Sequence, residues 1–134
     1  METQKSSKIM HIILWIAQVI VALCLLMGAA MKFMSIEKIA VLMPWTGEIP
    51  PLIVRTLGIV DLLAAVGLML PALIRVKPQL TQWAAIGTIV LMLSAIIFHI
   101  SRGEASVIGF NIFLAFLAAF IAWGRAAKVS IKAK

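Results

Sequence analysis

Four long apolar runs dominate the sequence and leave it few ways to fold. They cover residues 9–31, 52–74, 80–100 and 105–123, and each is close to the roughly 20 residues that a helix needs to cross a bilayer. Backbone groups in hydrocarbon must be hydrogen-bonded within the chain, so each run is predicted to be a helix. The sequence therefore predicts an all-α integral membrane protein, an antiparallel four-helix bundle.

Composition supports this interpretation. The chain has 134 residues, of which 63% are hydrophobic and 13% are charged, whereas a soluble domain is about 45–50% apolar and about 25% charged. A soluble chain this short buries too little surface to hide such an excess, so the excess is expected to face lipid. We expect one transmembrane domain over residues 9–124, between an N-terminal tail (1–8) and a basic C-terminal tail (125–134). The first run is too long for the apolar core of a signal peptide and is expected to remain in the protein.

The connection between the first two runs has a pattern of its own. Ser35 is a suitable N-cap for a short helix, and Pro44 would end it. Within residues 35–43 the apolar side chains fall on one helical face, formed by Ile36, Ile39, Ala40 and Met43. We expect a short amphipathic helix on the membrane surface; the alternative is an irregular loop.

The distribution of Lys and Arg predicts the orientation. Eight lie on the side of the two termini: Lys5, Lys8, Arg75, Lys77, Arg125, Lys128, Lys132 and Lys134. Four lie on the other side: Lys32, Lys38, Arg55 and Arg102. Because short cytoplasmic segments are enriched in basic residues, both termini are expected in the cytoplasm. The protein is expected in a bacterial inner membrane. The basic residues flank the spans, so we do not interpret the net charge of +7 as a nucleic-acid site.

Ionisable residues within a span are functional hypotheses by default. Asp61 is the tenth residue of the run 52–74 and lies near its middle, where an aspartate costs about 2.5–3.5 kcal/mol. Arg55 lies six residues earlier, which at the helical rise is about 9 Å closer to the surface. Asn111 lies at a depth comparable to that of Asp61 on the last run.

These residues, with others near the same side of the membrane, predict a polar pocket open to the outside. Its candidate ligand-binding residues are Asp61, Arg55, Asn111, His99, Arg102 and Lys32. Two alternatives stay open. In the first, Asp61 and Arg55 form an ion pair that only fixes packing, with Asn111 in an interhelical hydrogen bond worth roughly 1 kcal/mol. In the second, Asp61 handles protons.

Several kinds of chemistry have no support in the sequence. His11 and His99 fall at opposite ends of the bundle, so they cannot ligate one haem. No zinc, iron–sulfur, P-loop or dinucleotide motif occurs, and Cys24 is the only cysteine. No metal ligand and no catalytic residue is therefore predicted, and the chain is not expected to be an enzyme.

The order and spacing of several motifs resemble the DoxX-like family of small four-helix membrane proteins. The resemblance covers roughly residues 12–125. It rests on Gly28 with Lys32, Pro50, Arg55-Thr-Leu-Gly58, Asp61, Gly67-Leu-Met-Leu-Pro71, His99 with Arg102-Gly103-Glu104, and Gly124-Arg125. One departure is that the family usually carries Glu where this chain has Asp61.

The resemblance implies a compact four-helix bundle. Some members are linked to quinol oxidase or thiosulfate–quinone oxidoreductase systems, others associate with redox-defence enzymes, and an animal relative is an assembly chaperone. The expected function is thus an accessory or assembly subunit of a membrane redox system. The alternative is a protein that binds a quinone or another small apolar ligand. The expected partners are membrane lipids and a membrane redox complex or a second copy of the chain.

The orientation can be tested by labelling single cysteines in a Cys24→Ser background. Thr3→Cys, Val76→Cys and Lys132→Cys should all be protected from an impermeant thiol reagent in intact cells, because all three positions are expected in the cytoplasm. Lys38→Cys, on the opposite side, should react and serves as the control. Labelling of Val76→Cys from outside intact cells contradicts the orientation.

Overall fold

The computed structural model describes residues 2–134, and all their regular structure is helical. The elements are α1 (Glu2–Lys32), α2 (Ile36–Leu42), η1 (Pro44–Gly47), α3 (Pro51–Ile74), α4 (Leu80–Ser101), η2 (Ala105–Val107), α5 (Gly109–Trp123) and η3 (Gly124–Lys128). Four of these helices are long and apolar enough to cross a membrane. The all-α membrane fold predicted from the sequence is confirmed.

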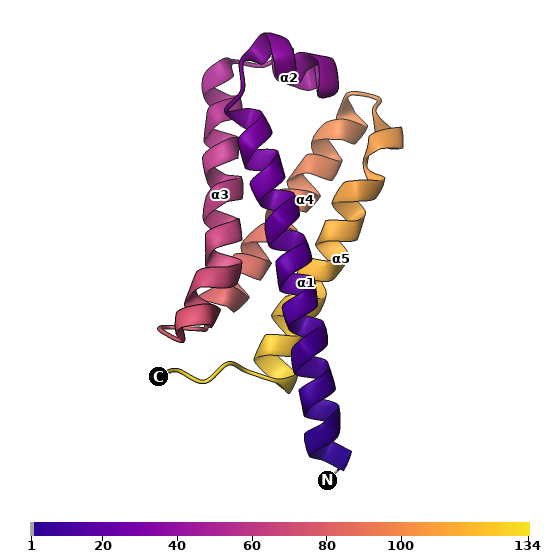
Figure 1. The fold of residues 1–134 in the computed structure, drawn as a ribbon. Helices are drawn as coiled ribbons and strands as arrows, with labels where there is room; N and C mark the ends of the chain where they lie inside the picture. The colour runs from indigo at the N-terminus through magenta and orange to yellow at the C-terminus, as the bar shows by residue number, and fades with distance from the viewer. Residues whose placement is uncertain (1) are drawn as a thin grey trace.

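The long helices run back and forth between two ends of the molecule (Figure 1). The chain passes up α1, down α3, up α4 and down α5 in that view, so both termini lie at the lower end, here called the terminal end. The short helix α2 lies across the other end, here called the α2 end. The helix α1 packs most extensively on α3, and α4 packs most extensively on α5. The fold therefore consists of two helix pairs.

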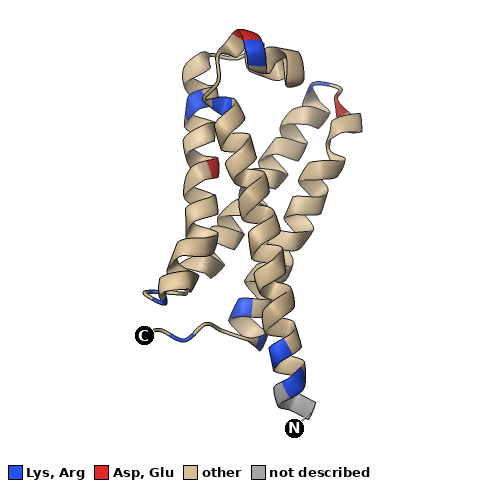
Figure 2. Cartoon of the chain, in the orientation of Figure 1, with Lys and Arg blue, Asp and Glu red and all other residues tan. Residues whose placement is uncertain are grey.

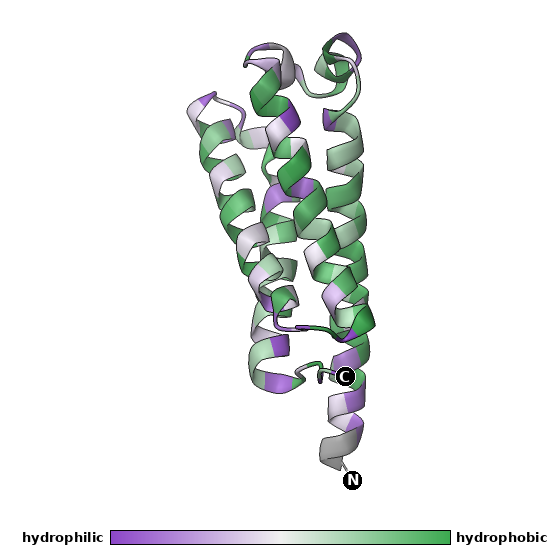
Figure 3. Cartoon of the chain, turned by 90° about the vertical axis from the view of Figure 1, so that its left-hand side faces the viewer, coloured by the Kyte–Doolittle hydropathy of each residue, from purple (hydrophilic) through white to green (hydrophobic). Residues whose placement is uncertain are grey.

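Charged residues gather at the two ends (Figure 2). Lys and Arg occur at both ends, whereas the Asp and Glu coloured in this figure all lie toward the α2 end. Between the ends, the outer surface is dominated by hydrophobic residues (Figure 3). Leu23, Ile97 and Phe116 are examples of large apolar side chains that are more than half exposed. Such a surface suits lipid and is costly in water.

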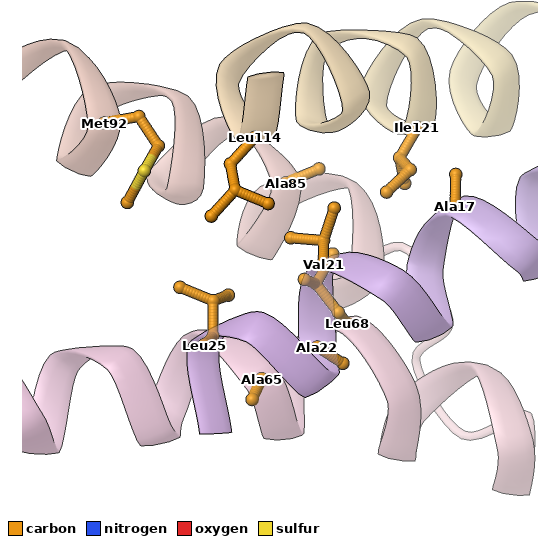
Figure 4. Packing of buried hydrophobic residues seen from close by; sticks show 10 residues of the cluster. All are labelled: Ala17, Val21, Ala22, Leu25, Ala65, Leu68, Ala85, Met92, Leu114 and Ile121. Atoms are coloured by element: carbon orange, nitrogen blue, oxygen red, sulfur yellow. The ribbon is translucent and has the colours of Figure 1, made fainter. Parts of the chain in front are cut away.

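The core lies between the four long helices (Figure 4). Val21 of α1, Leu68 of α3 and Leu114 of α5 are almost completely buried there, and Ala85 of α4 packs in the same cluster. Small residues let the helices approach closely. A Cβ atom added at Gly67 would lie 2.8 Å from the Cβ of Ala84, so α3 and α4 are in near-backbone contact at this level.

The short amphipathic helix is confirmed in α2. It begins at Ile36 after Ser35, whose side chain makes no capping hydrogen bond. Ile39 is completely buried, whereas Glu37 and Lys38, which lie off the apolar stripe, are both exposed. The predicted apolar stripe thus packs inward against the ends of the long helices.

One boundary differs from that expected. The last apolar run was expected to be helical from residue 105, but its first residues form the 3-10 turn η2 and α5 begins at Gly109. Gly103, with φ of +74°, turns the chain sharply just before this turn. At the other end, helical structure continues through Lys128, and the irregular C-terminal segment begins at Val129.

Glycine packing yields a stability prediction with a matched control. Gly67→Ala should destabilise the protein by about 1–3 kcal/mol, because the new methyl group overpacks the contact with Ala84. Gly87→Ala adds the same group to the neighbouring helix where nothing lies within 4 Å, and should be neutral or stabilising by about 0.5–1 kcal/mol. Unfolding in detergent measures both. Equal destabilisation by the two variants contradicts the close approach of α3 and α4.

Candidate functional site

A cavity of about 590 Å³ lies at the α2 end of the bundle. It is bounded by α1 and α3 on one side and by α4 and α5 on the other, and the segment from Leu42 to Trp45 lines it as well. Most of its lining is apolar, including Met27, Met31 and Met92. Its size falls within the roughly 300–1,000 Å³ that is common for small-molecule sites.

A largely buried ion pair forms part of the cavity wall. The Lys32 Nζ atom donates a hydrogen bond to Asp61 Oδ2 at 2.6 Å, and so joins the end of α1 to the middle of α3. Gly28 makes room for this pair, because a Cβ atom there would lie 3.2 Å from Asp61 Oδ2 and 3.3 Å from Lys32 Nζ. The partner of Asp61 expected from the sequence is thus identified as Lys32.

Arg55 is neither a ligand-binding residue of the cavity nor the ion-pair partner of Asp61, the two roles considered from the sequence. Its Nη1 atom donates to the carbonyl oxygens of Lys32 and Met34, where α1 ends. Carbonyls at a helix C-terminus have no partner within the helix, and a cationic side chain that binds them stabilises that end. Arg55 therefore holds the backbone of Lys32 in place through its carbonyl group, and Arg55 itself does not line the cavity.

A second polar network joins the loops at the α2 end. Arg102 Nη2 pairs with Glu48, and Arg102 Nε donates to Glu104 Oε1 at 2.8 Å. The same oxygen lies 3.3 Å from His99 Nδ1. The hydrogen bond from Arg102, followed by that from His99, lowers the pKa of Glu104 below its ordinary value. Glu104 is therefore charged at neutral pH, and Arg102, which pairs with both Glu104 and Glu48, holds the α4–α5 connection against the loop that follows η1.

Aromatic side chains close the same region. Trp45 of η1 contacts Phe98 and His99 edge-on, with ring centroids 5.7 and 6.2 Å apart. Such pairs add roughly 0.5–1.5 kcal/mol beyond the area they bury. All three residues line the cavity. The segment α2–η1 is thus fixed across the α2 end by these contacts.

Asn111 stands out among the polar residues of the cavity. It lines the wall from α5, yet within residues 5–134 no hydrogen bond joins its side chain to another group of the protein. A carboxamide offers both donors and acceptors. Asn111 is therefore placed to bind something that enters the cavity.

The structure brings together four of the six predicted site residues. Lys32, Asp61, His99 and Asn111 all line the cavity, whereas Arg55 and Arg102 act just behind its wall. Sequence reasoning missed Glu104 as a lining residue, although its place directly after Arg102-Gly103 was a usable signal. In the part of the chain that the structure describes, no group of three His, Cys, Asp or Glu residues is arranged to hold a metal ion.

The ion pair can be tested by single and double substitution. Asp61→Asn should destabilise the protein by about 3–5 kcal/mol, because it leaves the Lys32 ammonium buried without its partner. The double variant Lys32→Met/Asp61→Leu should recover most of that loss. Glu37→Gln, a charge on α2 outside any ion pair found among the described residues, should change stability by less than about 0.5 kcal/mol. A double variant as unstable as Asp61→Asn contradicts the pairing.

Comparison with known proteins gives one match. The sequence profile of the DoxX-like family matches residues 16–121, a range that includes Lys32, Asp61 and the other residues of the cavity wall. No match was found among curated proteins or among solved structures. The chain is a multi-pass integral membrane protein and belongs to the DoxX-like family.

Proposed function

We propose that the protein binds a small, uncharged, largely apolar molecule with one polar end, such as a quinone, in the cavity at the α2 end. The observation that carries this proposal is Asn111, an amide on the wall of an apolar cavity without a partner among the described residues. A carbonyl or hydroxyl group of the ligand would hydrogen-bond to it, while the methionine-rich wall would contact the apolar part.

The charges of the cavity favour a neutral ligand. Lys32 and Asp61 neutralise each other at 2.6 Å, and Glu104 is paired with Arg102. A charged head group would have to compete with these pairs, whereas a neutral group adds hydrogen bonds without disturbing them. A quinone carries acceptor oxygens and no charge, so it fits this pattern.

The accessory role expected from the family resemblance fits the same proposal. A subunit that holds a quinone for a membrane redox partner would need an apolar cavity of this kind. We therefore treat the accessory role as a consequence of ligand binding and test the binding first.

The test uses decylubiquinone and purified protein in detergent. At a concentration tenfold above its Kd, the ligand should stabilise the wild type by about 1.4 kcal/mol. Ala95→Leu fills space on the cavity wall and should abolish this shift. Ala30→Leu is the matched control, since it makes the same substitution at an exposed position of α1 that does not line the cavity.

Asn111→Leu separates the polar contact from the apolar one. It should keep the fold and reduce the ligand-induced shift, because it removes the hydrogen bond and preserves the approximate volume of the side chain. A shift in Ala95→Leu equal to that of the wild type contradicts binding in the cavity.

A further inference from the structure

Arg125 is buried at the terminal end, far from the cavity at the α2 end. It lies in η3 and is only 1% exposed. Its Nε atom donates to Gln18 Oε1 at 2.7 Å, and its Nη1 atom lies 2.9 Å from His11 Nδ1 and donates to the carbonyl of Val129 at 3.1 Å. Its Nη2 atom is shielded from solvent and has no hydrogen-bond partner among the described residues.

The groups around this guanidinium do not neutralise its charge. Gln18, His11 and a backbone carbonyl are its partners, and the salt bridges found among the described residues all lie toward the α2 end. Lys128 follows one turn later on the same element. A buried guanidinium with an unpaired Nη2 atom favours an anion, and a phosphate would bind it at two points once Nη1 is also released from the Val129 carbonyl.

The C-terminal segment begins at this site, where the Val129 carbonyl accepts from Arg125 Nη1. Residues 129–134 have no regular structure, and most are exposed. The segment crosses the terminal end of the bundle (Figure 1), and its last N–H donates to the carbonyl of Arg75 at 2.9 Å. A segment with so few buried contacts moves at small cost, and its displacement would break the hydrogen bond between Arg125 Nη1 and the Val129 carbonyl.

An apolar groove begins beside the same guanidinium. The Arg125 Cζ atom lies 5.6 Å from the centre of the Trp15 ring, and Trp15 also lines a shallow groove of about 350 Å³ on the outer face of α1. The other lining residues are Ile12, Ile16, Val19 and Ile20. These positions follow one another along α1 toward the middle of the bilayer, which is the path of a lipid acyl chain.

We propose that Arg125 anchors an anionic phospholipid, with the phosphate on its guanidinium and one acyl chain in the groove beside Trp15. The basic residues that surround the terminal end favour an anionic over a zwitterionic lipid; they are Lys5, Lys8, Arg75, Lys77, Lys128, Lys132 and Lys134. This site is separate from the cavity, so a test of lipid binding here does not depend on the proposed function of the cavity.

Native mass spectrometry of the purified chain, offered equal amounts of phosphatidylglycerol and phosphatidylcholine, tests the proposal. The wild type should retain phosphatidylglycerol preferentially. Arg125→Lys keeps the charge but loses the two-point fork, and should weaken this retention about tenfold, a factor equivalent to ~1.4 kcal/mol. Lys38→Arg, at the opposite end, is the control and should behave as the wild type.

A second pair of variants tests the groove without touching the buried cluster. Ile16→Trp fills the groove, whereas Leu23→Trp adds the same ring to an exposed position of α1 outside it. Only Ile16→Trp should reduce retention of phosphatidylglycerol. Inorganic phosphate alone should not reproduce the stabilisation that the lipid gives.

Three results overturn the proposal. The first is equal retention of the two lipids by the wild type. The second is unchanged retention in a folded Arg125→Lys variant. The third is full stabilisation by inorganic phosphate with no effect of Ile16→Trp, which would assign the site to a free anion.

Discussion

The ion pair between Lys32 and Asp61 fixes how the first helix docks on the rest of the bundle. A charge in the middle of a bilayer is tolerated only when it faces the protein interior and meets a partner. Asp61 satisfies this condition through one contact of 2.6 Å that joins α1 to α3. Arg55, earlier on α3, holds the carbonyls at the end of α1. Two side chains of α3 thus bind one turn of α1, one through its ammonium group and the other through its backbone.

Small residues explain why one end of the bundle packs tightly and the other stays open. Toward the terminal end, Gly67 meets Ala84 and Gly124 meets Leu14 so closely that no side chain fits between them. Toward the α2 end, the bulky Trp45 and Phe98 bridge the space between the helix pairs, and both line the cavity. The two pairs are therefore in close contact at one end and separated at the other, and the cavity occupies the separation.

The fold was predictable from the sequence because four apolar runs of bilayer length allow little else, and α2 was predictable from its stripe around Ile39. The site was predicted in part. Depth placed Lys32, Asp61, His99 and Asn111 on one side, but the partner of Asp61 depends on how α1 docks on α3, which helical periodicity does not determine. Arg55 was the nearest cation in sequence, yet six residues correspond to a turn of about 240°, so it points away from Asp61. Arg125 was assigned to the tail because no pattern separates it from the lysines around it.

Gln18 was the usable signal for that second cluster. A lone carboxamide in the middle of a span needs partners, and here its amide donates to the carbonyl of Leu68 at 2.8 Å while its oxygen accepts from Arg125. The two ends of the protein differ in how they balance charge. At the α2 end, Lys32 and Arg102 each meet a carboxylate supplied by the chain itself. At the terminal end, Arg125 meets only neutral groups and the ring of Trp15 among the described residues. A phospholipid phosphate, as proposed above for this site, would supply from the surroundings the negative charge that the chain itself does not place there.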